Sequence, residues 1–189
     1  AIEQTDHELV LPANSLVAHT SGSRSLSVLG YTASPNIGVF YPLQTFSKLK
    51  RVNFDDVPIL IEGDNSFTKK VLHSLAKKIS NTVSEASSSQ RKMIHLSAIF
   101  ASNFTNAMMV HAKDLMQEAK SDLQLLGPLL EETINKSLVL GPENAQTGPA
   151  ARGDLQMLDE HLQMLEKYPV MKETYQLISQ QILNRSETD

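Results

Sequence analysis

The chain has 189 residues, 41% of them hydrophobic and 20% charged, which is enough for one large domain or two small domains with real cores. The formal net charge is -4 and the basic residues are scattered, so we predict no nucleic-acid partner and no binding to an anionic membrane. The absence of cysteine excludes disulfides, thiolate metal sites and a cysteine nucleophile, and we predict no metal site. No apolar run is long enough to span a bilayer, and cytoplasm is the default localisation.

The first part of the chain alternates short apolar runs with polar turns. Residues 15–20 form an apolar run that Ser21-Gly22-Ser23 stops, and a short helix is expected over residues 24–29. Residues 37–41 and 57–62 are further apolar runs, which we interpret as buried strands because proline or glycine ends each of them. The polar and basic segment between these two strands is expected to be a surface loop.

An amphipathic helix is predicted after Asn65, a residue suited to an N-cap. Apolar residues recur from Phe67 to Ile79 at helical spacing, and the lysines lie largely off that stripe. Residues 81–84 are expected to add one last short strand. Because strands that alternate with helices are typical of a parallel α/β layer, we predict a partial Rossmann-type parallel sheet in a nucleotide-binding domain of residues 1–86.

Every periodic signal in the second part of the chain is helical, so we predict an all-helical domain of residues 87–189. Its first helix, expected over residues 90–119, is apolar on nearly all sides, which indicates a central and buried helix. Further helices are predicted over residues 122–139, 149–166 and 170–184. These neighbours are too few to cover the first helix, so we expect the helical domain to form a homodimer.

The turn after the first predicted strand is a candidate cofactor site. Ligands in open parallel sheets lie outside the carboxyl ends of the strands, and this turn occupies such an end. The residues predicted to bind the cofactor are His19, Thr20, Ser21, Gly22 and Ser23. The alternative is a simple glycine turn in which Ser23 caps the following helix.

Two other segments are also candidate sites. Residues 38–46 are a strand end that runs into a loop, unless proline merely ends the strand and Phe46 packs beneath the loop. On the long helix a polar stripe falls within about 40° at 3.6 residues per turn, with Asn103 beside it. The stripe consists of His95, Ser102, Asn106 and Lys113. Buried polar groups need partners, so this face is predicted to line a cleft or an interface, or else to be satisfied by neighbouring helices.

A loop fixed by glycine and proline, residues 147–154, enters the helix that carries His161. Arg152 can hold an anionic group by paired hydrogen bonds, and Asp154 and His161 share a helix face. We therefore predict that Arg152, Asp154 and His161 bind an acidic substrate. The alternative is a helix-capping loop with an internal ion pair.

Four motifs together resemble one family, in which a Rossmann-like domain precedes the domain of unknown function numbered 2520. The motifs are His19-Thr20-Ser21-Gly22, the strand end from Tyr41 to Phe46, Ala101-Ser102-Asn103-Phe104, and Thr147-Gly148-Pro149 through Arg152-Gly153-Asp154 with His161. This family is similar to pyrroline-5-carboxylate reductase, to ketopantoate reductase and to the 6-phosphogluconate dehydrogenase superfamily. The resemblance implies an α/β part followed by an all-α C-terminal domain like that of 6-phosphogluconate dehydrogenase.

The resemblance also implies an NAD(P)-dependent oxidoreductase that reduces a small carbonyl or imine acid, with NADP or NAD as the cofactor. Ser102, Asn103 and Asn106 would then orient the reacting group of the substrate. The lysine and asparagine that many relatives carry four residues apart correspond to Lys92 and Leu96, so that proton donor cannot be transferred. The His-Pro of the family is Tyr41-Pro42 here, which removes a second candidate acid.

The family's usual Gly-x-Gly-x-x-Gly loop is formed by none of the eight glycines. We therefore expect an N-terminally truncated chain that binds no dinucleotide by itself. Two hypotheses remain: a nicotinamide-dependent reductase, or a non-catalytic or regulatory dimer that retains the oxidoreductase fold.

Overall fold

The computed structural model describes residues 11–12, 14–32, 34–47 and 51–186. Contacts divide the chain into two compact units, unit 1 of Ala1–Ala107 and unit 2 of Met108–Asp189. The domain boundary expected after residue 86 stays a prediction. Contacts group the long helix with the sheet as far as Ala107. Within the described ranges, no helix is both long and apolar enough to cross a membrane.

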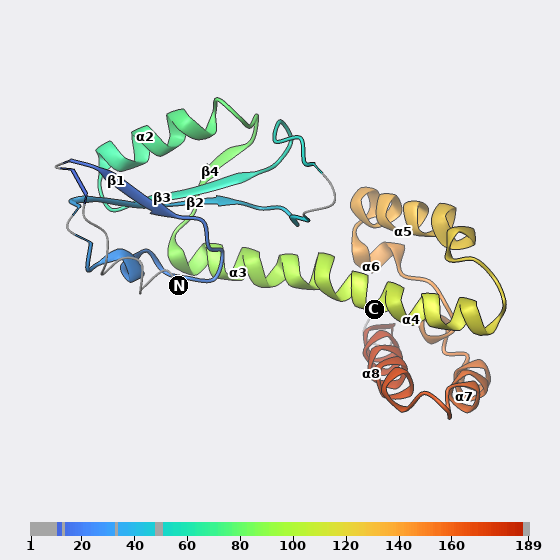
Figure 1. Ribbon diagram of the computed structural model, residues 1–189. Coiled ribbons are helices and arrows are strands. Elements are labelled where there is room, and N and C mark those ends of the chain that lie inside the picture. The colour runs from blue at the N-terminus through green and yellow to red at the C-terminus, as the bar shows by residue number, and fades with distance from the viewer. Residues whose placement is uncertain (1–10, 13, 33, 48–50, 187–189) are drawn as a thin grey trace. The chain divides into compact units, whose positions relative to one another are not determined.

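The described part of unit 1 contains one four-stranded sheet in the order β1-β2-β3-β4 (Figure 1). Its strands are β1 (Leu16–His19), β2 (Asn36–Pro42), β3 (Ile59–Gly63) and β4 (Val83–Glu85). The α/β class is confirmed, but the sheet is mixed: β1–β2 and β3–β4 are parallel, whereas β2–β3 is antiparallel. The connections explain this difference from the predicted parallel sheet. A helix crosses over between β3 and β4, whereas the described residues between β2 and β3 form no helix, and the chain simply turns back.

Helix α2 (Ser66–Ala76) covers one face of this sheet (Figure 1). It begins where predicted, because the side chain of Asn65 accepts a hydrogen bond from the Thr68 amide. Alternate strand residues point toward α2 and form an apolar core, which consists of Ile59, Ile61, Leu72 and Ala76 with Leu16, Ala18, Phe40 and Val83 packed around them. The residues between them along the strands, such as Leu60 and Glu62 in β3, point to the opposite face.

The long helix predicted over residues 90–119 is interrupted. It consists of α3 (Ser88–Ala98), a π-helical segment η2 (Ile99–Phe104) and α4 (Thr105–Glu118). Ser87 and Gln90 form a capping box that starts α3, and the first turns of α3 lie against the sheet face opposite α2 (Figure 1). The prediction that this helix is buried is wrong for a single copy of the chain, since Met93 and Phe100 are each 63% exposed.

The described part of unit 2 is all helical, as predicted. The three expected helices are α5 (Gly127–Leu140), α7 (Leu155–Met164) and α8 (Pro169–Ser186). The predicted ranges 122–139 and 149–166 also include two 3-10 segments, η3 (Leu123–Leu126) and η4 (Ala150–Arg152), whereas the short helix α6 (Pro142–Ala145) lies outside every predicted range. Proline stands at the start of α5, α6 and α8, where its missing amide costs nothing.

Substitutions on α2 can test the core of unit 1. Leu72 is 2% exposed and belongs to the core, so Leu72→Ala should lower the free energy of unfolding by about 2–5 kcal/mol. Leu75 lies on the same helix but is 50% exposed, so Leu75→Ala should cost less than about 1 kcal/mol. Urea denaturation followed by circular dichroism measures both values, and equal losses would contradict this assignment of the core.

Candidate functional site

The sheet face opposite α2 carries polar side chains at the centre of unit 1. In the strand register His19 pairs with Val39, and Val39 pairs with Glu62, so these three side chains point to the same face. Tyr41 lies two residues beyond Val39 in β2 and therefore shares that face. Buried polar groups require partners, and here the turn after β1 and the first turns of α3 supply them.

His19 holds the turn after β1 by both ring nitrogens. Its side chain is 5% exposed; Nδ1 accepts a hydrogen bond from the Ser21 amide at 3.2 Å, and Nε2 lies 3.2 Å from the Ser25 carbonyl oxygen. This pattern fits the neutral imidazole with its proton on Nε2. Burial lowers the pKa of His19, with the Ser25 carbonyl partly opposing it, which keeps the ring neutral. His19 thus stabilises the conformation of the turn through these two contacts.

The remaining residues of the turn divide into buried and outward-facing groups. Gly22 is buried, whereas Thr20 and Ser23 are exposed and Ser21 is half-buried. The helix that follows is a short 3-10 helix, η1 (Leu26–Leu29), with Ser25 at its N-cap. The alternative in which Ser23 caps that helix is therefore wrong. The hydroxyls of this turn offer donors and acceptors at the carboxyl end of a strand.

Gly22 brings the turn against a tyrosine and a histidine. A Cβ at this position would lie 2.7 Å from Tyr41 Cζ and 2.8 Å from His95 Nδ1, so a larger residue cannot pack there without a shift. Glycine is needed here for close approach rather than for an unusual backbone conformation. The turn after β1 is thus in contact with both β2 and α3.

Tyr41 and His95 form a hydrogen-bonded pair. The Tyr41 hydroxyl lies 3.0 Å from His95 Nδ1, and the rings meet edge to face with centroids 5.9 Å apart. Burial raises the pKa of Tyr41, so its phenol keeps its proton at neutral pH. The sequence points to both residues without pairing them, and Tyr41 in place of the family's histidine suggests only the loss of an acid. The available signal was strand alternation, which puts Tyr41 on the face of His19.

A pocket of about 390 Å³ opens beside this pair within unit 1. It is lined by Tyr41, Leu43, Gln44, Thr45, Phe46, His95, Ala98, Ile99, Ala101, Ser102 and Asn103. The strand end and part of the helix stripe, predicted separately, thus meet in one pocket; Lys113 of the stripe lies in unit 2 and does not line it. Asn106 is exposed and is not among its lining residues, because the π-helical segment before it breaks the 3.6-residue period that the stripe assumed.

The three residues predicted to bind the acidic substrate lie in unit 2. Asp154 caps α7 by accepting a hydrogen bond from the Met157 amide at 3.2 Å. His161 Nδ1 lies 2.7 Å from the Tyr175 hydroxyl. Arg152 ends η4 and is exposed. Their role in substrate binding stays a prediction. Among the residues that can be described, none form a cluster of three or more metal-binding side chains.

The pocket can hold a small polar ligand. Its hydroxyl, amide and imidazole groups offer donors and acceptors on one side, and the apolar side chains of Leu43, Phe46 and Ile99 complete the wall. The phenol of Tyr41 can donate a proton or a hydrogen bond, and its hydroxyl lies within hydrogen-bond distance of His95 Nδ1. This arrangement suits a ligand with a carbonyl or imine group.

Comparisons with known proteins agree with this architecture. A family model described as "Domain of unknown function (DUF2520)" matches residues 57–182. The crystal structure of the "putative NADP oxidoreductase BF3122" from Bacteroides fragilis is similar, with a TM-score of 0.86 and 40% sequence identity over 89% of this chain and 65% of that chain. This chain therefore spans less than two thirds of the Bacteroides protein. Protein TM1727 from Thermotoga maritima shares the fold, with a TM-score of 0.77 and 24% identity over 98% of this chain and 74% of that chain. No curated protein matches.

A methyl group at Gly22 should disturb the pair. Gly22→Ala should push Tyr41 and His95 apart and lower the free energy of unfolding by about 1–3 kcal/mol. Thr20→Ala is the control, because Thr20 is exposed in the same turn, and it should change the free energy of unfolding by less than about 0.5 kcal/mol. Chemical denaturation measures both variants. An unchanged free energy of unfolding in Gly22→Ala would show that the turn does not pack on the Tyr41–His95 pair.

Proposed function

The chain belongs to the DUF2520 family, and on that premise we propose that it is part of an NADP-dependent oxidoreductase that reduces a small carbonyl or imine acid. The name of the Bacteroides protein, at 40% identity, supports the oxidoreductase class and the choice of NADP. The observation that carries the proposal is the Tyr41–His95 pair at the wall of a pocket that Ser102 and Asn103 also line.

Reduction of a carbonyl or imine needs a hydride at carbon and a proton at oxygen or nitrogen. The nicotinamide supplies the hydride when it is bound. Tyr41 Oη holds a proton at neutral pH, because burial raises its pKa, and His95 Nδ1 lies within hydrogen-bond distance of it. Tyr41 is therefore the proposed proton donor to the reacting group, and His95 is its proton-exchange partner.

Ser102 and Asn103 are the proposed orienting residues. A hydroxyl and an amide can each hydrogen-bond a carbonyl or imine and fix it near the phenol of Tyr41. Asn106 is also a proposed orienting residue, and only the family resemblance supports that role. Arg152 is the proposed partner of the substrate's carboxylate, with Asp154 and His161 in support, because a guanidinium binds a carboxylate by two parallel hydrogen bonds.

The proposed nicotinamide contact is the turn after β1, where Thr20, Ser21 and Ser23 offer hydroxyls and Gly22 joins the turn to the Tyr41–His95 pair. The buried ring of His19 holds that turn through the Ser21 amide and the Ser25 carbonyl. Rossmann folds hold the pyrophosphate at a glycine-rich turn, and none of the eight glycines here has that spacing. We therefore expect the 189-residue chain alone to bind NADP weakly.

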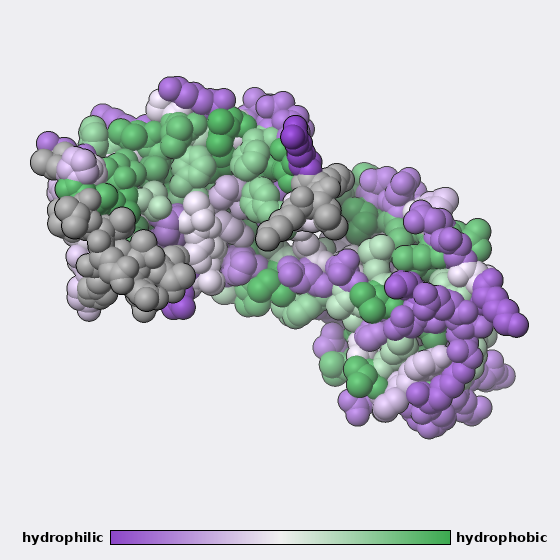
Figure 2. Space-filling model, viewed as in Figure 1, coloured by the Kyte–Doolittle hydropathy of each residue, from purple (hydrophilic) through white to green (hydrophobic). Residues whose placement is uncertain are grey.

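The proposal includes a homodimer. Large apolar side chains of the long helix are exposed in one copy of the chain: Met93 by 63%, Leu96 by 46%, Phe100 by 63% and Phe104 by 48%. Figure 2 shows hydrophobic residues reaching the surface along α3. A contiguous apolar surface of this kind favours burial against a second copy. A non-catalytic dimer with the same fold is the alternative outcome.

The proposed proton donor can be tested by removing one oxygen atom. In the full-length protein, Tyr41→Phe should lower kcat/KM for NADPH-dependent reduction of small keto and imino acids roughly 100- to 10,000-fold. NADPH oxidation, followed at its absorbance maximum, gives the rate. Tyr168→Phe is the matched control, since its hydroxyl binds Glu118 on unit 2, and it should keep the wild-type rate.

Three outcomes decide this test. A large loss in Tyr41→Phe alone supports the role of Tyr41. Equal rates for Tyr41→Phe and the wild type would remove Tyr41 from the chemistry. A full-length protein that oxidises NADPH with none of these substrates would favour the non-catalytic alternative.

The dimer can be tested by placing a charge in the exposed apolar face. Phe100→Asp should weaken self-association roughly tenfold or more, because an unpaired carboxylate would be buried at the interface. Leu75→Asp, on the half-exposed side of α2, is the control and should leave association unchanged. Light scattering at micromolar concentration measures both, and a monomeric wild-type protein would contradict the proposal.

A further inference from the structure

We propose that Arg91 is a positioning residue, whose buried guanidinium clamps the turn after β1 onto β3 and α3 and so keeps the cofactor-binding turn in register with the Tyr41–His95 pair. This inference rests on the proposed function for its catalytic meaning, whereas the clamp itself is a property of unit 1. Neither Arg91 nor Glu62 was singled out by the sequence analysis.

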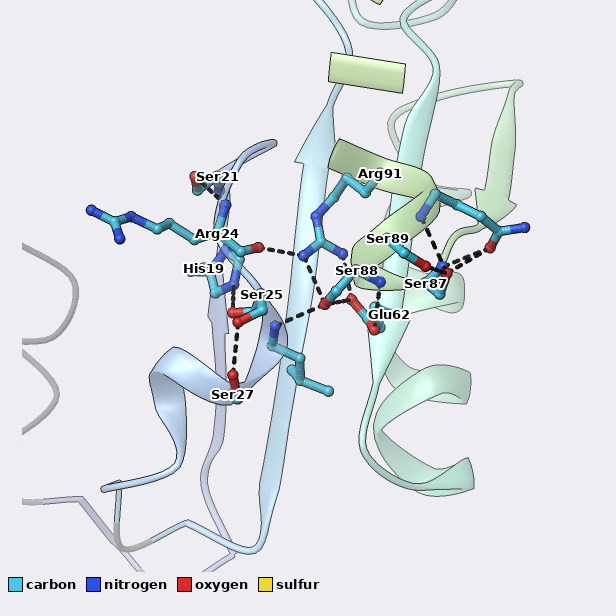
Figure 3. A network of polar contacts seen from close by, with 12 residues as sticks. His19, Ser21, Arg24, Ser25, Ser27, Glu62, Ser87, Ser88, Ser89 and Arg91 are labelled. Carbon is cyan, nitrogen blue, oxygen red and sulfur yellow. Dashed lines mark hydrogen bonds and ion pairs between the residues drawn. The ribbon is translucent and has the colours of Figure 1, made fainter. Parts of the chain in front are cut away.

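Arg91 is fully buried, with 0% of its surface exposed. Its Nη1 donates a hydrogen bond to Glu62 Oε2, which comes from β3, and the two side chains form an ion pair (Figure 3). Ser88, one turn earlier in α3, donates to the same carboxylate from its amide at 2.9 Å and from its hydroxyl at 2.8 Å. Burial raises the pKa of Glu62, but the hydrogen bonds from Arg91 and Ser88 outweigh it and lower that pKa overall.

The other half of the guanidinium reaches the turn. Arg91 Nη2 donates to the backbone carbonyl of Arg24, and Ser88 Oγ accepts a hydrogen bond from the Leu26 amide at 2.9 Å. Two backbone groups of the segment that follows β1 are thus held by residues of α3 that lie more than 60 positions away in the sequence (Figure 3). The same turn is tied at its other end by His19, through Ser21 and Ser25.

An ion pair of this kind fixes the relative orientation of the elements it joins more than it adds to the free energy of unfolding. An apolar pair of similar volume often serves a core equally well, because taking two charges out of water offsets most of their attraction. A guanidinium differs in presenting several donors in one rigid plane, so it can fix a carboxylate and a carbonyl in a set geometry. In unit 1 that geometry joins the end of β3, the start of α3 and the turn after β1.

Arg91 and His95 are four residues apart in α3 and therefore lie on one face of that helix. One residue holds the turn and the other holds Tyr41, while Gly22 of the turn packs against Tyr41 and His95. A shift of the turn relative to α3 would therefore move the proposed nicotinamide contact away from the proposed proton donor.

The kinetic experiment compares four variants of the full-length protein. Arg91→Met leaves the partly buried Glu62 without its ion-pair partner and tests the whole clamp. Glu62→Gln combined with Arg91→Met removes both charges while keeping an acceptor for Ser88, so thermal stability should return toward that of the wild type. Arg91→Lys keeps the charge but lacks the rigid fork. Lys92→Met removes an exposed charge from the same helix and is the control.

We expect the KM for NADPH to rise roughly tenfold or more in both variants that carry Arg91→Met, with a smaller change in the KM for the reduced substrate. Arg91→Lys should recover only part of the loss. Lys92→Met should match the wild type. If the double variant regains both the wild-type stability and the wild-type KM for NADPH, Arg91 serves the core alone and the proposal is overturned.

A second measurement is independent of activity. In the wild type the Arg24 carbonyl is held by Arg91, so trypsin should cut after Arg24 slowly; in both Arg91→Met variants that cut should be roughly tenfold faster or more. Cleavage after Arg51, in an exposed loop, should not change and serves as the internal reference. An unchanged rate after Arg24 overturns the clamp. A protein without reductase activity would refute the proposed function, and this measurement would still decide whether Arg91 holds the turn.

Discussion

A guanidinium that is buried must find acceptors, and the arrangement of unit 1 follows from where Arg91 finds them. The acceptors that lie outside α3 are a carboxylate on β3 and a backbone carbonyl in the turn after β1, and α3 packs where both are within reach. The position of α3 in turn brings His95 to Tyr41 at the end of β2. The polar face of the sheet is thus ordered by directional hydrogen bonds, whereas the face under α2 is ordered by apolar packing.

The strands and helices could be predicted because their signals are local. Apolar runs ended by proline or glycine marked β2 and β3, and Asn65 marked the start of α2. Strand direction carries no such signal. The antiparallel pairing of β2 with β3 depends on whether the connection forms a helix, and the polar loop between them was interpreted correctly without that conclusion being drawn.

The candidate site was predicted in pieces and not as a whole. The turn from His19 to Ser23, the strand end at Tyr41 and the residues Ser102 and Asn103 were all identified, but their meeting in space depends on Gly22, whose role is steric. The burial of Arg91 could not be predicted, because an arginine on a helix ordinarily lies on a solvated face. Its partner Glu62 is 29 residues away, so no helical spacing could connect the two.

The π-helical segment η2 limits how far a change in chain length at this place would spread. A π turn accommodates one residue more than an α turn, so loss of a single residue between Ile99 and Phe104 would let regular α geometry close through the gap. Because the π turn already absorbs the extra residue, the helix after the deletion would keep nearly its present phase around the helix axis relative to His95. The change would be confined to the segment that carries Ser102 and Asn103, so the extra residue shapes the pocket wall and leaves the direction of α4 unaffected.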